Sequence, residues 1–299
     1  MLRAEVQVRR GSFELEASIE VARGEIVAVM GPNGSGKSTL LGALAGTIPL
    51  AGGSVELESR MLSQAGQHRV PAARRGIGML WQESLLFPHL TALKNIEFGA
   101  ARGAVSRRSL RDPSTGGVVS NRSLRDPAQP DRLETSHTGA LVSRRSLRDP
   151  STGAVQHWLT ALDLAGLEHR KPRELSGGQQ RRVAIARALA ANPRVLLLDE
   201  PLASVDAASA PAIRTLLRVA LADRAGVLVT HDVAEALALA DRVILLEAGR
   251  VVRAGPTREV LATLGAGLSV EGEVGPDGSI RLPEGIRLAP GQRITVTAG

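Results

Sequence analysis

The sequence GPNGSGKST occupies residues 31–39 and decides the fold. It fits the pattern G-x-x-x-x-G-K-[ST], which is typical of a loop that holds nucleotide phosphates. An apolar run, EIVAVM (residues 25–30), precedes it, and a helix is predicted from Lys37 onward. The backbone N–H groups of such a loop and the N-terminus of its helix attract anions. The alternative is a glycine-rich turn that binds nothing, and the flanking strand and helix argue against it.

Short apolar runs alternate with helical segments along most of the chain. Further strands are predicted at residues 77–81, 195–199, 227–230 and 242–247, and helices at 176–190, 208–222 and 233–240. Apolar runs of this length between helices are typical of strands that are covered on both faces. The sequence therefore predicts an α/β fold with a mostly parallel sheet.

The segment VLLLDEP, residues 195–201, ends a predicted strand with two carboxylates. A carboxylate at the end of a buried strand is costly unless it meets a cation or hydrogen bonds. We expect Asp199 to coordinate Mg²⁺, directly or through water, together with the Ser38 hydroxyl. Glu200 is placed to orient or deprotonate an attacking water. An acidic turn without a ligand is the alternative.

The segment LSGGQQRRVAIARAL, residues 175–189, predicts a second helix start suited to anions. Ser176 is a good N-cap, and Gly177 and Gly178 would expose backbone N–H groups. One nucleotide does not need two such sites from one chain. The simplest interpretation is that this helix start serves the nucleotide of a partner copy, and a helix cap softened by glycine is the alternative.

Six ordered motifs resemble those of the nucleotide-binding subunits of ABC transporters, over residues 2–102 and 154–264. GPNGSGKST resembles their Walker A motif, LSGGQ their signature and VLLLDEP their Walker B motif. Gln82 lies in a segment that resembles the Q-loop, Asp206 ends one that resembles the D-loop, and His231 matches the switch histidine. The resemblance implies a RecA-like P-loop NTPase core with an N-terminal antiparallel β part and an α-helical signature subdomain.

The resemblance also implies that two copies close head to tail on two Mg–ATP. Lys37 would hold the phosphates, Glu200 would activate water and His231 would contact the γ-phosphate, as the three candidate catalytic residues. Near the N-terminus, Phe13 is a candidate for stacking on adenine and is left open. The candidate Mg²⁺ ligands are Ser38, Gln82 and Asp199, and the candidate nucleotide-binding residues are Gly31, Pro32, Asn33, Gly34, Ser35, Gly36, Lys37, Ser38, Thr39, Gln82, Ser176, Gly177, Gly178, Gln179 and Asp206.

Residues 103–153 contain near-identical copies of a short phrase, RRSLRDPSTGG from Arg107 and RRSLRDPSTGA from Arg144 among them. Nine Arg against five acidic residues give this segment a net charge of +4, more than half of the chain's +7. Each copy carries one Leu and cannot bury enough apolar surface to order itself. We interpret the segment as a disordered insert, with an Arg-rich tether to lipid or nucleic acid as the alternative. No nucleic-acid partner is expected.

The composition narrows the function classes further. The 299 residues include no Cys, which excludes disulfides, thiolate catalysis and Cys-ligated metals. The sequence shows no signal peptide and no apolar run that approaches the roughly 18 residues of a spanning helix. We therefore expect a peripheral protein on the cytoplasmic face of the cell membrane. An ATPase domain is predicted at 1–264, with a helical subdomain at about 85–190, and a truncated β-rich appendage at 265–299.

The segments LFPHLT (residues 86–91) and LASVD (202–206), with the appendage, look most like subunits of molybdate, sulfate or related oxyanion importers. Molybdate is the preferred cargo, with iron and polyamines as alternatives. Permease subunits, a substrate-binding protein and a second copy of the chain are the expected partners. Two rival classes are a soluble ABC ATPase and a non-productive paralogue. The single cassette without a long coiled-coil insertion argues against the first, and the intact motifs argue against the second.

Overall fold

The computed structural model describes residues 1–109, 134–135, 141–142, 152–263, 273–274 and 280–281. A single sheet of eleven strands lies at the centre of the fold in this part of the chain. In spatial order its strands are β6 (His68–Arg69), β5 (Arg60–Gln64), β4 (Gly52–Leu57), β1 (Leu2–Arg10), β2 (Phe13–Val21), β13 (Arg250–Pro256), β12 (Arg242–Glu247), β3 (Ile26–Met30), β11 (Ala225–Val229), β10 (Val195–Asp199) and β7 (Ile77–Leu80).

The sheet has a parallel half and an antiparallel half. Strands β12, β3, β11, β10 and β7 pair parallel with one another, whereas β6, β5, β4, β1 and β2 pair antiparallel with one another. Strand β13 joins the two halves, since it pairs antiparallel with β12 and parallel with β2. Every residue of β3, β10 and β11 is buried, as expected for parallel strands that are covered on both faces. The predicted parallel sheet and the antiparallel N-terminal part are both confirmed.

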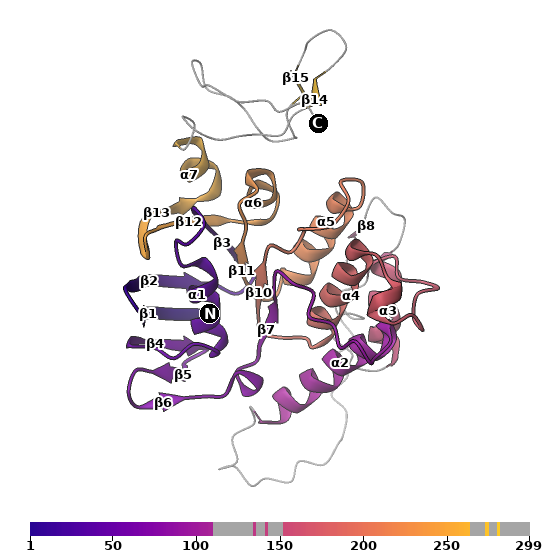
Figure 1. The fold of residues 1–299 in the computed structure, drawn as a ribbon, viewed down its shortest axis with the longest axis horizontal. Coiled ribbons are helices and arrows are strands. Elements are labelled where there is room, and N and C mark those ends of the chain that lie inside the picture. Colours follow the sequence, from indigo (N-terminus) through magenta and orange to yellow (C-terminus); the bar gives the residue numbers. More distant parts are fainter. Residues whose placement is uncertain (110–133, 136–140, 143–151, 264–272, 275–279, 282–299) are drawn as a thin grey trace, which may run out of the picture.

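Helices cover both faces of the sheet, as Figure 1 shows. Helix α1 (Lys37–Ala45) lies on the side of the antiparallel strands, and α4 lies on the opposite side of β10 (Figure 1). The other helices are α2 (Ala92–Ser109), α3 (Thr152–Ala161), α4 (Gly177–Ala190), α5 (Ala210–Leu221), α6 (Val233–Leu239) and α7 (Thr257–Thr263), with short 3₁₀ turns at Ala72–Arg74 and Pro172–Glu174. Two further strand pairs are short: β8 (Glu134–Thr135) with β9 (Leu141–Val142), and β14 (Glu273–Val274) with β15 (Ile280–Arg281).

The central strands separate two apolar cores. On β3, Ile26, Ala28 and Met30 face a core shared with helices α2 to α7, whereas Val27 and Val29 face a core shared with α1 and the antiparallel strands. The residues of β10, β11 and β12 alternate between the two cores in the same way. This division follows from strand geometry, since successive side chains point to opposite faces.

Helices α2, α3 and α4 pack against one another in the first core. Trp158 on α3 is 1% exposed and is the largest fully buried side chain. Helix α2 approaches α4 closely, because a Cβ at Gly99 would lie 2.1 Å from the carbonyl oxygen of Arg187. Among the described residues, no helix is both long and apolar enough to cross a bilayer.

The observed elements follow the predicted ones closely. Strand β11 begins at Ala225, two residues before the predicted start, and α5 begins at Ala210 instead of 208. Helix α2 continues to Ser109, which takes in the first seven residues of the segment interpreted as an insert, and α3 begins at Thr152. The rest of that segment lies outside the described residues except for the β8–β9 pair, and the C-terminal appendage lies outside them except for the β14–β15 pair.

Candidate functional site

The phosphate loop connects the end of β3 to the start of α1. Gly31 has a φ of 149°, and a Cβ at this position would lie 2.0 Å from the carbonyl oxygen of Leu246 on β12. The Ser35 N–H donates to the Pro32 carbonyl at 3.2 Å, and the Gly249 N–H donates to the Ser35 carbonyl at 3.0 Å. The turn between β12 and β13 therefore braces the loop from outside. All nine predicted residues, Gly31 to Thr39, lie in this loop or in the first turn of α1.

The Lys37 side chain folds back over its own loop. Its Nζ donates to the carbonyl oxygens of Gly31 at 2.7 Å and Pro32 at 2.9 Å. Burial lowers the pKa of Lys37, and the nearby charges of Glu200 and Asp199 oppose that shift. The ammonium group is therefore held against the loop within the field of both carboxylates, and its carbonyl partners can be exchanged for phosphate oxygens.

One polar atom of the loop lacks a partner. Ser35 is 2% exposed, and within the described part of the chain its hydroxyl makes no hydrogen bond. Buried hydroxyl groups are normally hydrogen-bonded, so an unpaired one in a loop of this shape fits a site that is completed by a ligand.

Ser38, in the first turn of α1, lies next to Asp199 at the end of β10. The Ser38 hydroxyl donates to Oδ2 of Asp199 at 3.4 Å. Burial, followed by the charge of Glu200, raises the pKa of the buried Asp199 carboxyl, and the Ser38 hydrogen bond and the charges of Arg181 and Lys37 partly oppose this. A carboxylate in this setting gains from a bound cation.

The donor set at this point fits magnesium. Mg²⁺ prefers oxygen ligands and is commonly held by one or two protein groups, with waters and substrate phosphates completing the octahedron. Ser38 and Asp199 supply such groups beside the phosphate loop. Among the described residues no cluster of three or more His, Cys, Asp or Glu side chains forms a metal site without a substrate. A site shared with the phosphates is therefore the arrangement that the residues support.

Glu200 and His231 form the second pair of the site. Nδ1 of His231 lies 2.8 Å from Oε1 of Glu200, and their side chains are 78% and 13% exposed, respectively. The hydrogen bond to Glu200, followed by its charge, raises the pKa of His231. Glu200 has a positive φ of 48°, a conformation that costs energy for a non-glycine residue and is often found at functional sites. Its N–H donates to the Val229 carbonyl at 2.9 Å.

The topology brings these groups to one edge of the sheet. Strands β3, β11, β10 and β7 are parallel neighbours, so their carboxyl ends lie together. The phosphate loop follows β3, His231 follows β11, Glu200 follows β10 and Gln82 follows β7. Ligands in open α/β sheets bind at this edge. The Gln82 residue is exposed, and its carbonyl is fixed by a hydrogen bond from Arg181 at 3.0 Å.

The signature residues form the N-terminus of α4. The Ser176 hydroxyl accepts from the Gln179 N–H at 3.3 Å, and Oε1 of Gln179 accepts from the Ser176 N–H at 3.0 Å. This capping box satisfies two backbone donors. In the described part of the chain the N–H groups of Gly177 and Gly178 make no hydrogen bond, and space for a Cβ is open at Gly177. The helix start therefore offers free donors to an anion.

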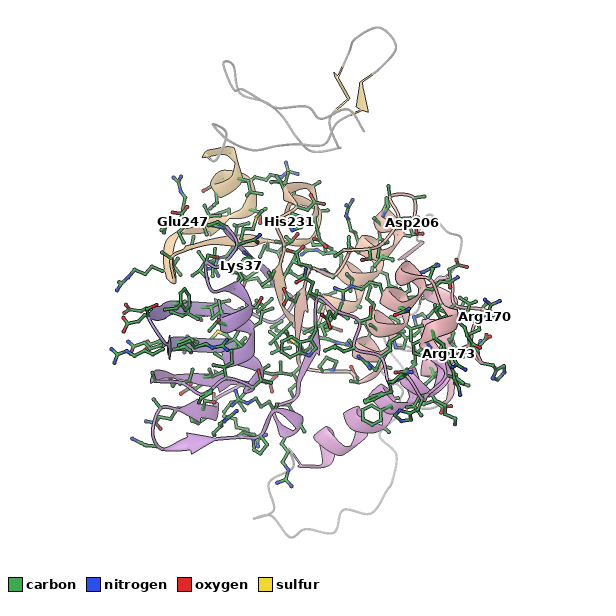
Figure 2. All side chains as sticks on the ribbon, viewed as in Figure 1. Lys37, Arg170, Arg173, Asp206, His231 and Glu247 are labelled. Atoms are coloured by element: carbon green, nitrogen blue, oxygen red, sulfur yellow. The ribbon has the colours of Figure 1, made fainter. Side chains whose placement is uncertain are left out.

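The signature and the D-loop lie apart from the phosphate loop. Asp206 accepts a hydrogen bond from the Ser209 N–H at 2.8 Å, near the start of α5. Figure 2 shows Asp206, and Arg173 two residues before the LSGGQ segment, well separated from Lys37 and His231. The structure thus brings together Lys37, Ser38, Asp199, Glu200, His231 and the Gln82 segment. It does not bring Asp206 or the signature residues 176–179 to them.

Two residues of the site were missed or left open in the sequence. Arg181 is 1% exposed and contacts the backbone behind Asp199 and Glu200. The sequence does carry a signal for Arg181, because this residue lies three and four positions before the buried Ala184 and Ile185. It is therefore a charged residue on an otherwise apolar face of the helix. The Phe13 ring lies against the phosphate loop, because a Cβ at Gly36 would be 2.9 Å from its Cζ atom. Phe13 follows the turn between β1 and β2, and only the fold places it there.

Comparisons with known proteins agree with this geometry. A family model described as ABC transporter matches residues 15–203. The molybdenum import ATP-binding protein ModC of Mycobacterium tuberculosis is 40% identical over 298 residues, which are 95% of this chain and 69% of that protein. ModC of Albidiferax ferrireducens is 36% identical over 270 residues, which are 88% of this chain and 60% of that protein.

A solved structure has the same fold. It is the dimeric ATP-binding cassette MJ0796 in a post-hydrolysis state bound to ADP and Pi, with a TM-score of 0.62 and 27% sequence identity. The match covers 86% of this chain and 99% of the cassette.

Proposed function

This chain belongs to the ABC transporter family of ATPases, and from that premise we propose that it binds and hydrolyses ATP to drive an importer of molybdate or a related oxyanion. The observation that carries the proposal is the convergence of four strand ends on one edge, with Ser38 within 3.4 Å of Asp199 and His231 within 2.8 Å of Glu200. These two pairs provide the parts that phosphoryl transfer to water requires.

In the proposed binding step the loop and Lys37 take the place of water around the phosphates. Backbone N–H groups of residues 31–36 and the N-terminus of α1 point donors at the negative charge. Nζ of Lys37 exchanges its carbonyl partners, on Gly31 and Pro32, for phosphate oxygens. The Phe13 ring beside Gly36 offers an apolar face on which adenine can stack. Mg²⁺, held by Ser38 and Asp199 and approached by Gln82, would supply charge neutralisation at the phosphates.

In the proposed hydrolysis step Glu200 acts on water. Its Oε1 is engaged by Nδ1 of His231, which leaves Oε2 to accept a proton from the attacking water. When Nδ1–H of His231 donates to Glu200, Nε2 on the other side of the exposed ring stays available to bind the γ-phosphate. The raised pKa of His231 favours the imidazolium form, which strengthens that contact as negative charge develops. Glu200 therefore handles the proton and His231 holds both Glu200 and the phosphate.

The separated signature supports an assembly of two copies. One chain offers two helix starts suited to phosphate, those of α1 and α4, and these two helices lie on opposite sides of β10 (Figure 1). A head-to-tail dimer brings the signature residues 176–179 and Asp206 of each copy to the nucleotide of the other. The similarity to a dimeric cassette supports this arrangement.

The cargo, the remaining partners and the location rest on the relatives. Two proteins that resemble this chain over most of its length are named molybdenum import ATP-binding proteins. We accordingly infer that the chain works at the cytoplasmic face of a membrane, bound to permease subunits that receive the oxyanion from a substrate-binding protein. Domain bounds of 1–264 for the ATPase, with a helical subdomain at about 85–190 that an insert at 103–153 interrupts, and of 265–299 for a β-rich appendage are part of the same proposal.

The first experiment measures the chemistry. Steady-state phosphate release at saturating Mg–ATP should vanish in Glu200→Gln, while affinity for a fluorescent ATP analogue stays within about threefold. The same variant should elute as a dimer with ATP and as a monomer without it. A Glu200→Gln protein that remains monomeric at millimolar ATP would exclude the head-to-tail dimer, and a parent without turnover would favour a non-productive paralogue.

The second experiment identifies the partners and the cargo. The tagged chain is purified from native membranes, and its partners are identified by mass spectrometry. A multi-span permease, recovered with a binding protein, supports the importer. The complex is then placed in liposomes, and its ATPase rate is measured with the binding protein loaded with molybdate, with sulfate or with Fe³⁺. The three rates are compared. Stimulation by molybdate alone supports the proposed cargo, whereas recovery of only ribosomal or DNA-associated proteins would point to a soluble ATPase.

A further inference from the structure

Arg181 is a buried cation at the centre of the candidate site. It lies in the second turn of α4 and is 1% exposed. Its guanidinium group has five N–H donors, and each has a backbone carbonyl as its partner. Nε donates to Pro201 at 2.8 Å, one terminal nitrogen donates to Trp81 and to Gln82, and the other donates to Asp199 and to Glu200.

The charge of Arg181 is retained despite burial. Burial lowers the pKa of Arg181 to about 10, and the charges of Asp199, Glu235 and Glu200 limit the fall. The side chain therefore stays protonated at neutral pH. Burying a cation is costly unless every donor is satisfied and counter-charge is near. A leucine of similar size would avoid that cost, so a packing role alone does not account for the arginine.

The five carbonyls belong to two separate segments of the site. Trp81 and Gln82 begin the segment after β7, and residues 199–201 end β10 and lead away from it. These segments carry the Gln82 side chain and both carboxylates of the site. Glu200 is held from both sides, since its N–H donates to Val229 and its carbonyl accepts from Arg181. This clamp explains how a backbone with a φ of 48° stays in place.

We propose that Arg181 is a positioning residue that ties the signature helix to the residues that hydrolyse ATP. The proposal rests on the proposed function, in which α4 of one copy contacts the nucleotide bound by the other. Through Arg181, α4 is fixed to Gln82, Asp199 and Glu200 of its own copy. A shift of α4 as it meets the partner's nucleotide is thereby transmitted to the carboxylates at its own. Each site is then set for hydrolysis only when the other is occupied.

The test uses Arg181→Met, Arg181→Lys and the control Arg182→Gln. Methionine keeps most of the volume and removes all donors, whereas lysine keeps the charge but has only three donors on one atom and cannot span both segments. Arg182 is the next residue on the same helix, and it bonds the Leu162 carbonyl and Asp163 instead. The control therefore removes a neighbouring charge without touching the five carbonyls that Arg181 binds.

We expect a split between binding and turnover. Affinity for a fluorescent ATP analogue should stay within about threefold in all variants, since the phosphate loop is unchanged. The kcat of both Arg181 variants should fall about 10²-fold, the effect expected when a catalytic group is displaced by about 1 Å. KM should change little, and Arg182→Gln should hydrolyse ATP at the parent rate. A purely electrostatic or packing role would let Arg181→Lys recover most of the activity.

Fluorescence quenching by acrylamide measures the exposure of the segment that Arg181 holds in place. The chain has two tryptophans, and Trp158 is 1% exposed, so the quencher reports chiefly on Trp81. The Trp81 carbonyl is one of the partners of Arg181. Quenching should increase in both Arg181 variants and remain at the parent level in Arg182→Gln. A structural defect elsewhere would not raise quenching at this segment alone.

The outcomes separate this proposal from the proposed function. A parent that does not hydrolyse ATP defeats the proposed function. A parent that does, with kcat and quenching of Arg181→Lys both within about threefold of it, overturns the proposal for Arg181 alone. Circular dichroism checks folding, and if Arg181→Met does not fold the lysine variant decides. A double variant with Glu200→Gln should still dimerise with ATP, because the Ser176 cap is intact.

Discussion

The buried Glu235 carboxyl makes the stability of the chain depend on pH. Glu235 lies in the first turn of α6, is 3% exposed and accepts a hydrogen bond from the Thr230 hydroxyl. Burial raises its pKa from 4.5 to about 7. The Thr230 bond and the charge of Arg214 lower this pKa, whereas the charges of Asp232 and Glu200 raise it further. Between these two pH values the native state binds more protons than the unfolded chain.

The sign and size of the effect follow from that difference. Because the native state holds the extra proton, stability is lost as pH rises from about 4.5 and the loss is complete above pH 7. Each pKa unit is worth about 1.4 kcal/mol, so the full loss is about 3 kcal/mol, most of it between pH 5 and 8. For a domain of this size the melting temperature should fall by about 5 to 10 °C from this group.

The assay compares melting curves of the parent and Glu235→Gln at pH 5 and pH 8. Glutamine keeps the acceptor for Thr230 but cannot ionise, so the variant should lose this part of the pH dependence and gain on the parent at pH 8. Glu5→Gln, an exposed carboxylate on β1, is the matched control and should leave the profile unchanged. Parallel profiles for the parent and Glu235→Gln would refute the reasoning and would mean that the buried carboxylate is ionised in the native state.

Three further substitutions test other parts of the structure. Gly31→Ala places a Cβ 2.0 Å from the Leu246 carbonyl, and the strain of about 1 to 3 kcal/mol should weaken binding of a fluorescent ATP analogue about 10- to 100-fold, so unchanged affinity would contradict the described loop. Trp158→Ala empties a fully buried site and should cost about 3 to 5 kcal/mol in urea unfolding, and a loss under 1 kcal/mol would mean that α3 is packed differently. Phe13→Ala should raise KM for ATP about tenfold with kcat unchanged, since base stacking is worth about 1 to 3 kcal/mol, and an equal effect on inorganic triphosphate, which has no base, would exclude stacking.

Local patterns predicted the parts of the site that are local in the chain. The phosphate loop needs a strand, glycines and a helix start within fifteen residues, and the Ser176 cap needs only its own turn. Both were therefore readable from spacing. The pairing of Ser38 with Asp199 spans 161 residues and that of Glu200 with His231 spans 31. The sequence predicted shared roles for these residues, and the parallel strand order supplied the contacts.

The residues that were not predicted act through long-range backbone contacts. Arg181 meets carbonyls about 100 residues away, and a carbonyl has no identity that a sequence pattern can reveal. Gly249 braces the phosphate loop through its N–H for the same reason. Phe13, a candidate that the sequence left open, contacts Gly36 although two strands, β13 and β12, lie between β2 and β3 in the sheet. Such partners become visible only when the sheet order is known.

The two apolar cores on either side of β3, β10 and β11 have an energetic consequence. Side chains such as Leu41 and Trp158 lie in different cores and share no neighbours across the sheet. Changes at distant sites without shared partners usually add. Destabilising substitutions in the two cores should therefore combine as independent losses, whereas pairs within one core should not. The core that contains α2 to α7 can accordingly accumulate substitutions that suit a new partner while the core around α1, next to the phosphate loop, keeps its packing.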